Sequence, residues 1–175
     1  GINNVSKDDQ PRPVYITEGH SLGESLIEQL RFRSLDDVEM VVAAYIVGSI
    51  DDDGYLRRDI TSLSDDLAFT RGLEVSTEEI ERVLAIVQEL EPAGIGARSL
   101  QECLMLQMRR HTLDTPTKRL AKKILSNHFE AFAKKHYEKL MARLGVGEDE
   151  FREAIEYIRS LSPKPGNLYT DAGID

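Results

Sequence analysis

The chain has 175 residues, of which 41% are hydrophobic and 30% charged, a balance typical of a globular protein rather than a disordered one. Its net charge of −9 argues against general nucleic-acid affinity for the whole chain, because phosphates are bound by Lys and Arg. The apolar runs fall short of the roughly 20 residues that a membrane helix needs, and the single cysteine excludes a disulfide framework. These features predict a cytoplasmic protein.

The chain is expected to begin with an irregular stretch. Residues 1–19 carry no periodic pattern, and we expect them to form a flexible lead-in. Since the sequence begins with Gly rather than Met, we also expect a piece of a longer protein.

The first helix is predicted from Ser21 to about Arg33. Ser21 and Glu24 have the spacing of a capping box, in which the hydroxyl accepts from an early backbone N–H and the carboxylate reaches back.

Two more helices are expected before residue 75. Ser34 and Asp37 repeat the capping spacing and predict a helix to about Ile50. This helix is apolar on nearly every side, which is typical of a helix at the centre of a bundle. Three Asp and one Gly at residues 51–54 then predict a turn. The third helix is expected over residues 60–69, followed by a glycine that ends it.

The fourth predicted helix has a clear pattern and a clear end. It begins at a capping box, and its apolar residues keep a 3.6-residue period as far as residue 90. Pro92 then lacks a backbone N–H, and Gly94 and Gly96 permit backbone angles that other residues avoid. We therefore predict a hinge over residues 92–98, and Pro92, Gly94, Gly96 and Arg98 are candidate partner-binding residues, because a hinge would set how the two units meet a partner. Arg98 could equally serve only to cap or pair at the junction.

Helical patterns continue through the second half of the chain. The expected helices cover residues 99–111, 115–128, 129–133, 136–144 and 148–161. Thr115 has the position of an N-cap and is followed by a proline at the first helical position. A Pro-Lys-Pro-Gly run at residues 163–166 is expected to end the last helix, and residues 162–175 are expected to form a linker.

The two halves of the chain differ in charge. Residues 20–91 carry 17 Asp or Glu and six Arg, whereas residues 99–161 carry nine acidic and 12 basic residues. Halves of opposite sign suggest two units with different surfaces. No segment alternates like a strand, so we predict an all-α protein made of two small helical bundles joined by a Pro/Gly hinge. Residues 20–91 would form the first subdomain and residues 99–161 the second.

No catalytic, cofactor-binding or metal site is predicted. Aligning Gly54 with the invariant glycine of a calcium loop puts Ile60 where a bidentate Glu is needed, so residues 51–54 are expected to form a surface turn. The four histidines show no ligand spacing with Cys103, which has the position of a small buried residue. We therefore expect a binding module rather than an enzyme, with no cofactor and no small-molecule substrate.

Two patterns point to a macromolecular partner. The first is a basic stretch made of Arg109, Arg110, Lys118, Arg119, Lys122 and Lys123. It is a candidate contact surface, although such runs also occur on solvated helix faces. The second is a helix-turn-helix outline over Tyr137–Arg159, whose alternative function would be that of a DNA-binding regulator. Its second helix has a net charge of −3, which opposes entry into a groove lined with phosphates, so a hairpin used only for packing is the simpler interpretation.

Four stretches of the sequence, taken in order, form a recognisable set. They are Ser-Leu-Gly-Glu-Ser-Leu at residues 21–26, Asp-Asp-Asp-Gly-Tyr-Leu at 51–56, Glu-Pro-Ala-Gly-Ile-Gly-Ala-Arg-Ser-Leu-Gln-Glu-Cys-Leu at 91–104, and Ile-Arg-Ser-Leu-Ser-Pro-Lys-Pro-Gly at 158–166. Over about residues 20–168, the set resembles the sigma-54 family of bacterial transcription factors. The third stretch is the most specific, because the family shows Pro-x-Gly, an apolar residue, Ala-Arg and Leu-x-Glu-Cys-Leu. Ser99 stands where the family commonly has Asp, and either residue can cap a helix.

The resemblance implies a role in transcription initiation. Such factors have an N-terminal region that meets an ATP-driven activator, a central region that grips core RNA polymerase, and a C-terminal region that reads DNA. This chain resembles the central region, so it is expected to bind core RNA polymerase, with residues 20–91 as the core-binding subdomain. The resemblance also implies that residues 162–175 are an exit linker toward a DNA-binding domain absent from this sequence. Promoter DNA and the ATPase activator would be reached only through other parts of the full-length protein, and no membrane partner is expected. The basic stretch would meet an acidic polymerase surface or nearby nucleic acid, and residues 92–98 would set the placement of the two subdomains.

Overall fold

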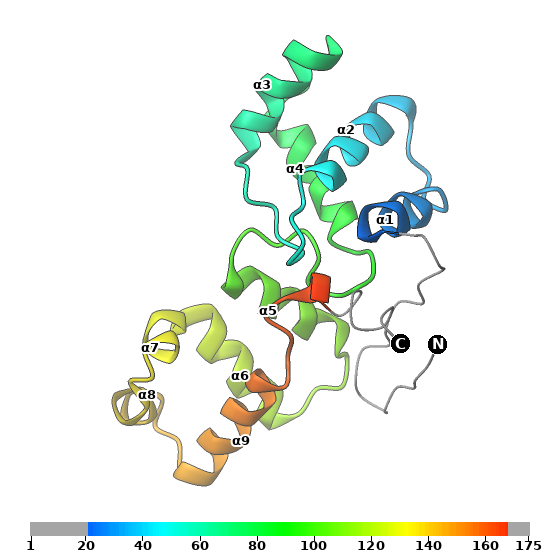
Figure 1. Cartoon of the computed structure of the whole chain (residues 1–175). Helices are drawn as coiled ribbons and strands as arrows, with labels where there is room; N and C mark the ends of the chain where they lie inside the picture. The colour runs from blue at the N-terminus through cyan, green and yellow to red at the C-terminus, as the bar shows by residue number, and fades with distance from the viewer. Residues whose placement is uncertain (1–20, 168–175) are drawn as a thin grey trace. The chain divides into compact units, whose positions relative to one another are not determined.

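The computed structural model describes residues 21–167 of the chain (Figure 1). These residues form helices joined by short turns, and no β-strand occurs among them, which confirms the predicted all-α class. In chain order the helices are α1 (Leu22–Leu30), α2 (Asp37–Gly48), α3 (Ile60–Arg71), α4 (Thr77–Val87), α5 (Leu100–Arg110), α6 (Pro116–Asn127), α7 (Phe129–Ala133), α8 (Tyr137–Leu144) and α9 (Glu148–Arg159). The expected lead-in at residues 1–19 lies outside the described residues.

The chain folds into two compact units, each with a core of its own. Unit 1 holds the residues up to Arg98 and resumes at Lys164, whereas unit 2 comprises Ser99–Pro163. Unit 1 therefore contains α1 to α4, and unit 2 contains α5 to α9. Since the chain leaves unit 1 after Arg98 and returns to it after Pro163, unit 2 is an insertion in unit 1.

Unit 1 is built around α2, which packs against α1, α3 and α4. Val42, Ala43 and Ile46 of α2 are buried almost completely. An apolar sequence on nearly every side suits this central place, because several faces of the helix meet other elements. Full burial of a side chain such as Ile46 contributes about 1.5–3 kcal/mol to the stability of the unit.

The start of α2 differs from the prediction. The helix has Asp36 as its N-cap and does not begin at Ser34. The Asp36 carboxylate accepts a bond from the Glu39 backbone N–H at 2.7 Å, and the Glu39 carboxylate accepts from the Asp36 N–H at 2.9 Å. Arg82 of α4 binds the same Glu39 carboxylate at 2.7 Å. This second partner from another helix favours the box at Asp36, and the local spacing of residues does not reveal it.

The segment after α4 is a buried part of unit 1. Residues 92–97 are all buried, and Ile95 lies in the core with none of its surface exposed. The Gly96 N–H donates to the Gly54 carbonyl at 2.8 Å, and Gly96 has a φ of 79°, which L-residues rarely adopt. The backbone of this segment is thus bonded inside the unit. Its predicted action as a hinge between the two units stays a prediction.

Unit 2 has a second core, formed mainly by α6 and α9. Ala121, Ile124 and Leu125 of α6 are fully buried, and Ala154 and Ile155 of α9 lie in the same cluster. These buried residues recur with the 3.6-residue period of a helix that is apolar on one side. The exposed sides of α6 and α9 are left for charged residues.

A buried amide fixes the end of unit 2. Gln107 of α5 is 1% exposed. Its Nε2 donates to the Ser162 carbonyl at 2.6 Å, and its Oε1 accepts from the Ser162 N–H at 2.8 Å. Both ends of the buried amide therefore have partners, as a buried polar group requires.

Beyond Pro163 the chain returns to the turn at residues 51–54 of unit 1. Pro165 and Gly166 are buried there, and the Gly166 N–H donates to the Asp53 carbonyl at 2.9 Å. Within the expected exit linker, residues 164–167 thus belong to unit 1, whereas Ser162 and Pro163 belong to unit 2. The remainder of that linker, residues 168–175, lies outside the described residues.

Candidate partner-binding surfaces

The predicted site residues fall into two groups, one in each unit. Pro92, Gly94 and Gly96 are buried in unit 1, so they have no surface for direct contact with a partner while the unit is folded. Arg98, at the end of their segment, is exposed, and its guanidinium lies 3.8 Å from the Glu81 carboxylate. Replacing Pro92, Gly94 or Gly96 would therefore affect binding only by changing the structure of unit 1, whereas Arg98 could contact a partner directly.

Unit 2 gathers four of the six predicted basic residues around one depression, which we call the α5–α6 depression. Its lining includes the cations Arg109, Lys118, Arg119 and Lys122 and the apolar side chains of Met105, Met108 and Leu113. Leu113 lies in the loop between the two helices and is 70% exposed. We call these four cations the basic rim. A depression lined by cations and apolar side chains has the composition of a protein interface, which combines apolar contacts with polar groups.

Local features of the sequence place these cations. Thr115 caps α6 by accepting a hydrogen bond from the Lys118 backbone N–H at 3.1 Å. Because Ala121 faces the core, the period of the helix leaves Lys122 exposed. Arg109 lies in the last turn of α5, where the helix dipole favours a cation. Sequence spacing alone could predict each of these positions, but not that the two helices share one depression.

The cations of this depression differ in how far they are neutralised. Arg119 lies 2.9 Å from Asp114, and because both side chains are exposed the pair contributes little to stability. The Lys118 ammonium lies 5.7 Å from the centre of the Tyr157 ring, within the range of a cation–π contact. Among residues 21–167, Lys122 has no carboxylate partner. Its charge is therefore available to a partner.

Two of the predicted basic residues lie outside the lining of this depression. Arg110 is half-buried at the end of α5, and Lys123 is exposed on α6 beside Lys122. Within the described part of the chain, neither Lys122 nor Lys123 makes a side-chain hydrogen bond or ion pair. This pair can therefore be replaced without loss of an internal contact.

Sequence reasoning missed two exposed aromatic residues of unit 1. Phe32, just after α1, is 84% exposed, and Phe69, near the end of α3, is 92% exposed. Each lies two residues after a buried leucine, Leu30 or Leu67, and is therefore out of phase with the buried side of the nearest helix. That difference in phase is the signal that could have found them. Large apolar side chains on the surface are candidates for interface anchors.

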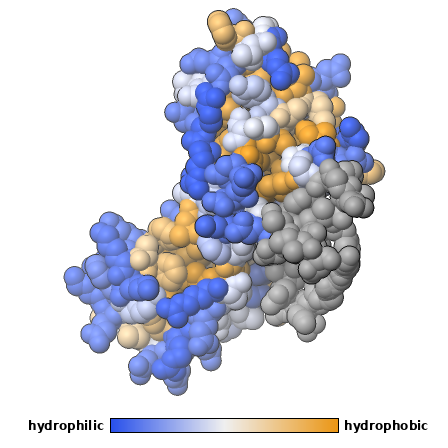
Figure 2. Space-filling model, viewed as in Figure 1, coloured by the Kyte–Doolittle hydropathy of each residue, from blue (hydrophilic) through white to orange (hydrophobic). Residues whose placement is uncertain are grey.

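Unit 1 also has a groove between α1 and α2. Ile27 and Val47 line it, together with Gly23 and Gly48. Space remains beside α2, since a Cβ at Gly48 would meet no atom within 4 Å. Hydrophobic side chains gather over α2 on the face that Figure 2 shows. Unit 1 thus combines an acidic sequence with an apolar surface on its central helix.

The Asp-rich turn at residues 51–54 is stabilised by hydrogen bonds within unit 1. The Asp51 carboxylate accepts a bond from the Tyr55 N–H at 2.9 Å and one from Arg57 at 3.0 Å. Burial raises the pKa of Asp51, but these donors outweigh it and hold that pKa below its ordinary value. Within residues 21–167, no group of three His, Cys, Asp or Glu side chains could hold a metal ion, and no helix is long and apolar enough to span a membrane.

The hairpin of the alternative hypothesis consists of α8 and α9. Gly145 ends α8 in a left-handed conformation with a φ of 67°. Arg159 donates to the Tyr137 hydroxyl at 3.2 Å, which ties the two helices together. Arg152 lies 3.0 Å from Asp149, so one of the two cations on α9 is already neutralised. The surface of α9 stays acidic and does not suit a groove lined with phosphates.

Comparisons with known proteins give consistent matches. Residues 14–174 match a family model described as "Sigma-54 factor, core binding domain". The chain is 38% identical over 151 residues to the RNA polymerase sigma-54 factor of Pseudomonas aeruginosa, which covers 86% of this chain and 30% of that protein. The corresponding protein of Bacillus subtilis is 38% identical over 150 residues, covering 85% of this chain and 32% of the relative. That of Azotobacter vinelandii is 36% identical over 165 residues, covering 94% and 32%.

The matches bear on both hypotheses drawn from the sequence. They confirm the resemblance noted there and do not support the alternative of a DNA-binding regulator that uses the α8–α9 hairpin. The chain spans about a third of the length of these relatives.

Proposed function

This chain belongs to the sigma-54 factor family, whose core-binding domain it matches, and we propose that it binds bacterial core RNA polymerase. The observation that carries the proposal is the match over residues 14–174, because the description of that family names core binding. The α5–α6 depression supports a protein partner, since it combines apolar side chains with a rim of cations. The role is binding rather than catalysis, and it would be performed in the cytoplasm, where transcription takes place.

Both units contribute to the proposed interface. Unit 1 offers Phe32 and Phe69 as apolar anchors, and unit 2 offers Leu113 inside the α5–α6 depression. A few buried anchors carry most of the binding energy of an interface, while charges around them set orientation and association rate. The basic rim therefore suits an acidic surface of polymerase. Residues 92–98 would set the placement of the two units on that surface.

The direct test is a titration of the labelled chain with purified core RNA polymerase. We expect saturable binding. Leu113→Ser should weaken it roughly 10-fold, because an exposed anchor is lost while both cores stay intact. The matched control is Leu100→Ser, which replaces a second partly exposed leucine of unit 2 that does not line the depression. A parent chain that does not bind polymerase would reject the proposed function.

Charge reversal tests the basic rim separately. Lys122→Glu combined with Lys123→Glu should slow association and weaken polymerase binding about 10-fold at low salt, and less at high salt because ions screen the charges. Lys139→Glu combined with Arg143→Glu is the control, since it makes the same change in net charge outside the α5–α6 depression. A Lys122/Lys123 variant that binds like the parent chain would remove the basic rim from the interface.

The rest of the sigma-54 role requires a longer protein. As in the family that this chain resembles, promoter DNA and an ATP-driven activator would be engaged by parts of the full-length protein beyond these 175 residues. The chain alone is accordingly expected to bind polymerase without recognising a promoter sequence.

A further inference from the structure

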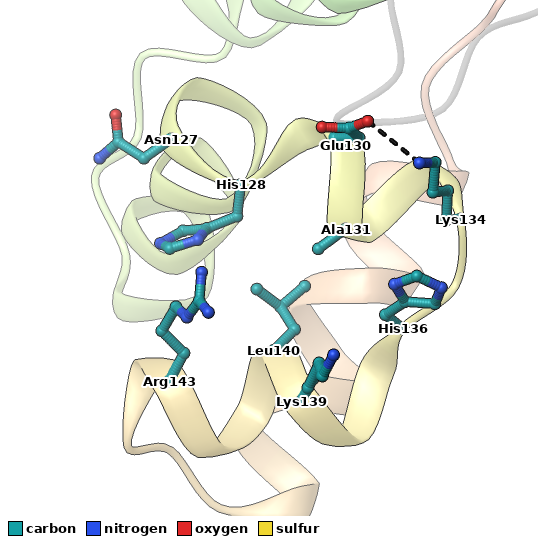
Figure 3. A pocket seen from close by; sticks show the side chains of 9 residues that line it. All are labelled: Asn127, His128, Glu130, Ala131, Lys134, His136, Lys139, Leu140 and Arg143. Atoms are coloured by element: carbon teal, nitrogen blue, oxygen red, sulfur yellow. Dashed lines mark hydrogen bonds and ion pairs between the residues drawn. The ribbon is translucent and has the colours of Figure 1, made fainter.

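A second depression of unit 2 lies between the end of α6, α7 and α8 (Figure 3). The polar side chains lining this α7–α8 depression are mostly cations and N–H donors: Asn127, His128, Lys134, His136, Lys139 and Arg143. Glu130 is the one acidic residue of the lining, and its carboxylate is bound by Lys134 at 3.0 Å. The depression therefore carries an excess of positive charge.

This positive charge is not compensated within unit 2. Among residues 21–167, no carboxylate pairs with Lys139 or Arg143. The guanidinium of Arg143 points toward the ring of His128, so groups from different helices converge on one space (Figure 3). Lys139 and Arg143 lie one helical turn apart on α8, so their like charges repel each other, and an anion bound beside them offsets that repulsion.

The turn between α7 and α8 provides an independent observation. Lys135, between two residues that line the depression, has a φ of 61°. This left-handed conformation favours glycine and is costly for a residue with a Cβ. Within the described part of the chain, the Lys135 side chain makes no ion pair that would require a lysine. A cation therefore stands at a strained position between two lining residues in the sequence, where glycine would fit better.

The nature of the ligand follows from a contrast between the two depressions. The α5–α6 depression contains the exposed Leu113, whereas the apolar lining of the α7–α8 depression is limited to Ala131 and Leu140, and Leu140 is 1% exposed. A protein partner needs apolar anchors, which this depression lacks. Backbone phosphates of a nucleic acid are bound by Lys, Arg and polar donors alone.

We infer that the α7–α8 depression binds the phosphate backbone of a nucleic acid without reading its sequence. This contact is additional to polymerase binding and does not require it. The net charge of −9 over the whole chain opposes the contact, so its affinity is low and falls steeply with salt. When the chain is bound to polymerase, this contact would bind unit 2 to a nearby duplex whatever its sequence.

The test is a titration of a labelled duplex of mixed sequence with the 175-residue chain at low salt. Lys139→Glu combined with Arg143→Glu should weaken duplex binding about 10-fold or more. Lys122→Glu combined with Lys123→Glu, which changes the net charge equally, should weaken it less than about 3-fold. Equal effects of the two pairs, or no duplex binding by the parent chain, would overturn the inference. Polymerase binding tests the proposed function separately. There, the Lys122/Lys123 variant is expected to bind more weakly, and the Lys139/Arg143 variant is the control.

Two further measurements distinguish loss of duplex binding from loss of folding, and a nucleic acid from an acidic protein as the ligand. Lys135→Gly should melt at or above the temperature of the parent chain and bind the duplex about 3-fold more weakly, whereas unchanged binding would count against the inference. In NMR titrations, the imidazole signals of His128 and His136 should shift with inorganic phosphate and with the duplex. A shift with polyglutamate but not with the duplex would replace the inference by an acidic protein partner.

Discussion

Two glycines approach each other where the chain returns from unit 2 to unit 1. A Cβ on Gly166 would lie 2.0 Å from the Asp52 carbonyl oxygen, and one on Gly54 would lie 2.8 Å from the Gly166 nitrogen. Both neighbours are backbone atoms, which cannot rotate away as a side chain can. Gly54 also has a φ of 99°, so its conformation and its surroundings both favour glycine.

We expect Gly166→Ala to destabilise unit 1 by roughly 2 kcal/mol, because the added methyl group forces the returning chain off the turn. Gly48→Ala is the matched control. A Cβ there meets nothing within 4 Å, and alanine in a helix is neutral or stabilising by about 0.5–1 kcal/mol. Chemical denaturation followed through signals of unit 1 measures both changes. Equal stabilities of the two variants would contradict the close approach.

The amide of Gln107 gives a second prediction for a single residue. Gln107→Leu should lower the free energy of unfolding of unit 2 by about 2 kcal/mol, because Ser162 loses both hydrogen bonds to the buried amide, while its carbonyl keeps the weak Cys103 thiol donor at 3.5 Å. Gln101→Leu, which removes one bond to the Leu125 carbonyl from a half-buried side chain, should cost less than about 1 kcal/mol. Denaturation of the two variants side by side checks the order, and a larger loss for Gln101→Leu would refute it.

At the scale of the helices, acidic side chains at turns and N-caps of unit 1 have lowered pKa values. A hydrogen bond from Arg82 lowers the pKa of Glu39, which belongs to the cap of α2. The backbone N–H of Ser62 lowers the pKa of Asp59, the N-cap of α3. For Asp51, burial acts in the opposite direction and is outweighed by donors from the turn. The carboxylates bind fewer protons in the folded chain than in the unfolded one, so folding is favoured where they are ionised.

Unit 1 should therefore lose stability in acid. The contribution of these carboxylates is complete above their ordinary values of 3.8 for Asp and 4.5 for Glu, and it is lost as pH falls through the lower values of the folded state. The melting temperature of unit 1 should decline as pH falls from about 5 to about 3. Asp51→Asn keeps an oxygen acceptor but cannot titrate, so its decline should be shallower. If the melting temperature of the Asp51→Asn variant falls with pH as steeply as that of the parent chain, Asp51 does not contribute to the loss of stability in acid.

At the scale of the whole molecule, the two hydrophobic cores have no residue in common among residues 21–167. Leu63 and Ile80 lie in the core of unit 1, and Ile124 and Leu125 lie in the core of unit 2, all of them fully buried. A cavity made in one core therefore removes packing from that core alone.

Ile124→Ala should destabilise unit 2 by about 2–5 kcal/mol, since a fully buried side chain leaves a cavity. Amide hydrogen exchange should speed up in α6 and α9 and stay unchanged around Leu63 and Ile80. Leu63→Ala is the reciprocal control and should leave exchange in α6 unchanged. Faster exchange in both units after either change would contradict the separation of the cores.

The sequence by itself determined most helices and their buried sides. Ser21 and Glu24 form the capping box that their spacing predicts, and α6 begins where Thr115 and the following proline indicate. These signals act between residues within one or two helical turns, so they are present in the sequence itself. The family could also be identified from the sequence, because the motif at residues 91–104 is recognisable without a structure.

Only the tertiary structure decided the environment of the loops and the grouping of the charges. The Pro and Gly residues of segment 92–97 suit a hinge or a buried turn equally, and hydrogen bonds such as that from Gly96 to Gly54 decided its burial. Arg109 and Lys122 meet around one depression because α5 packs on α6. The physical reason is that periodicity reports which side of a helix is buried, whereas the element that covers this side is set by contacts between residues far apart in the chain.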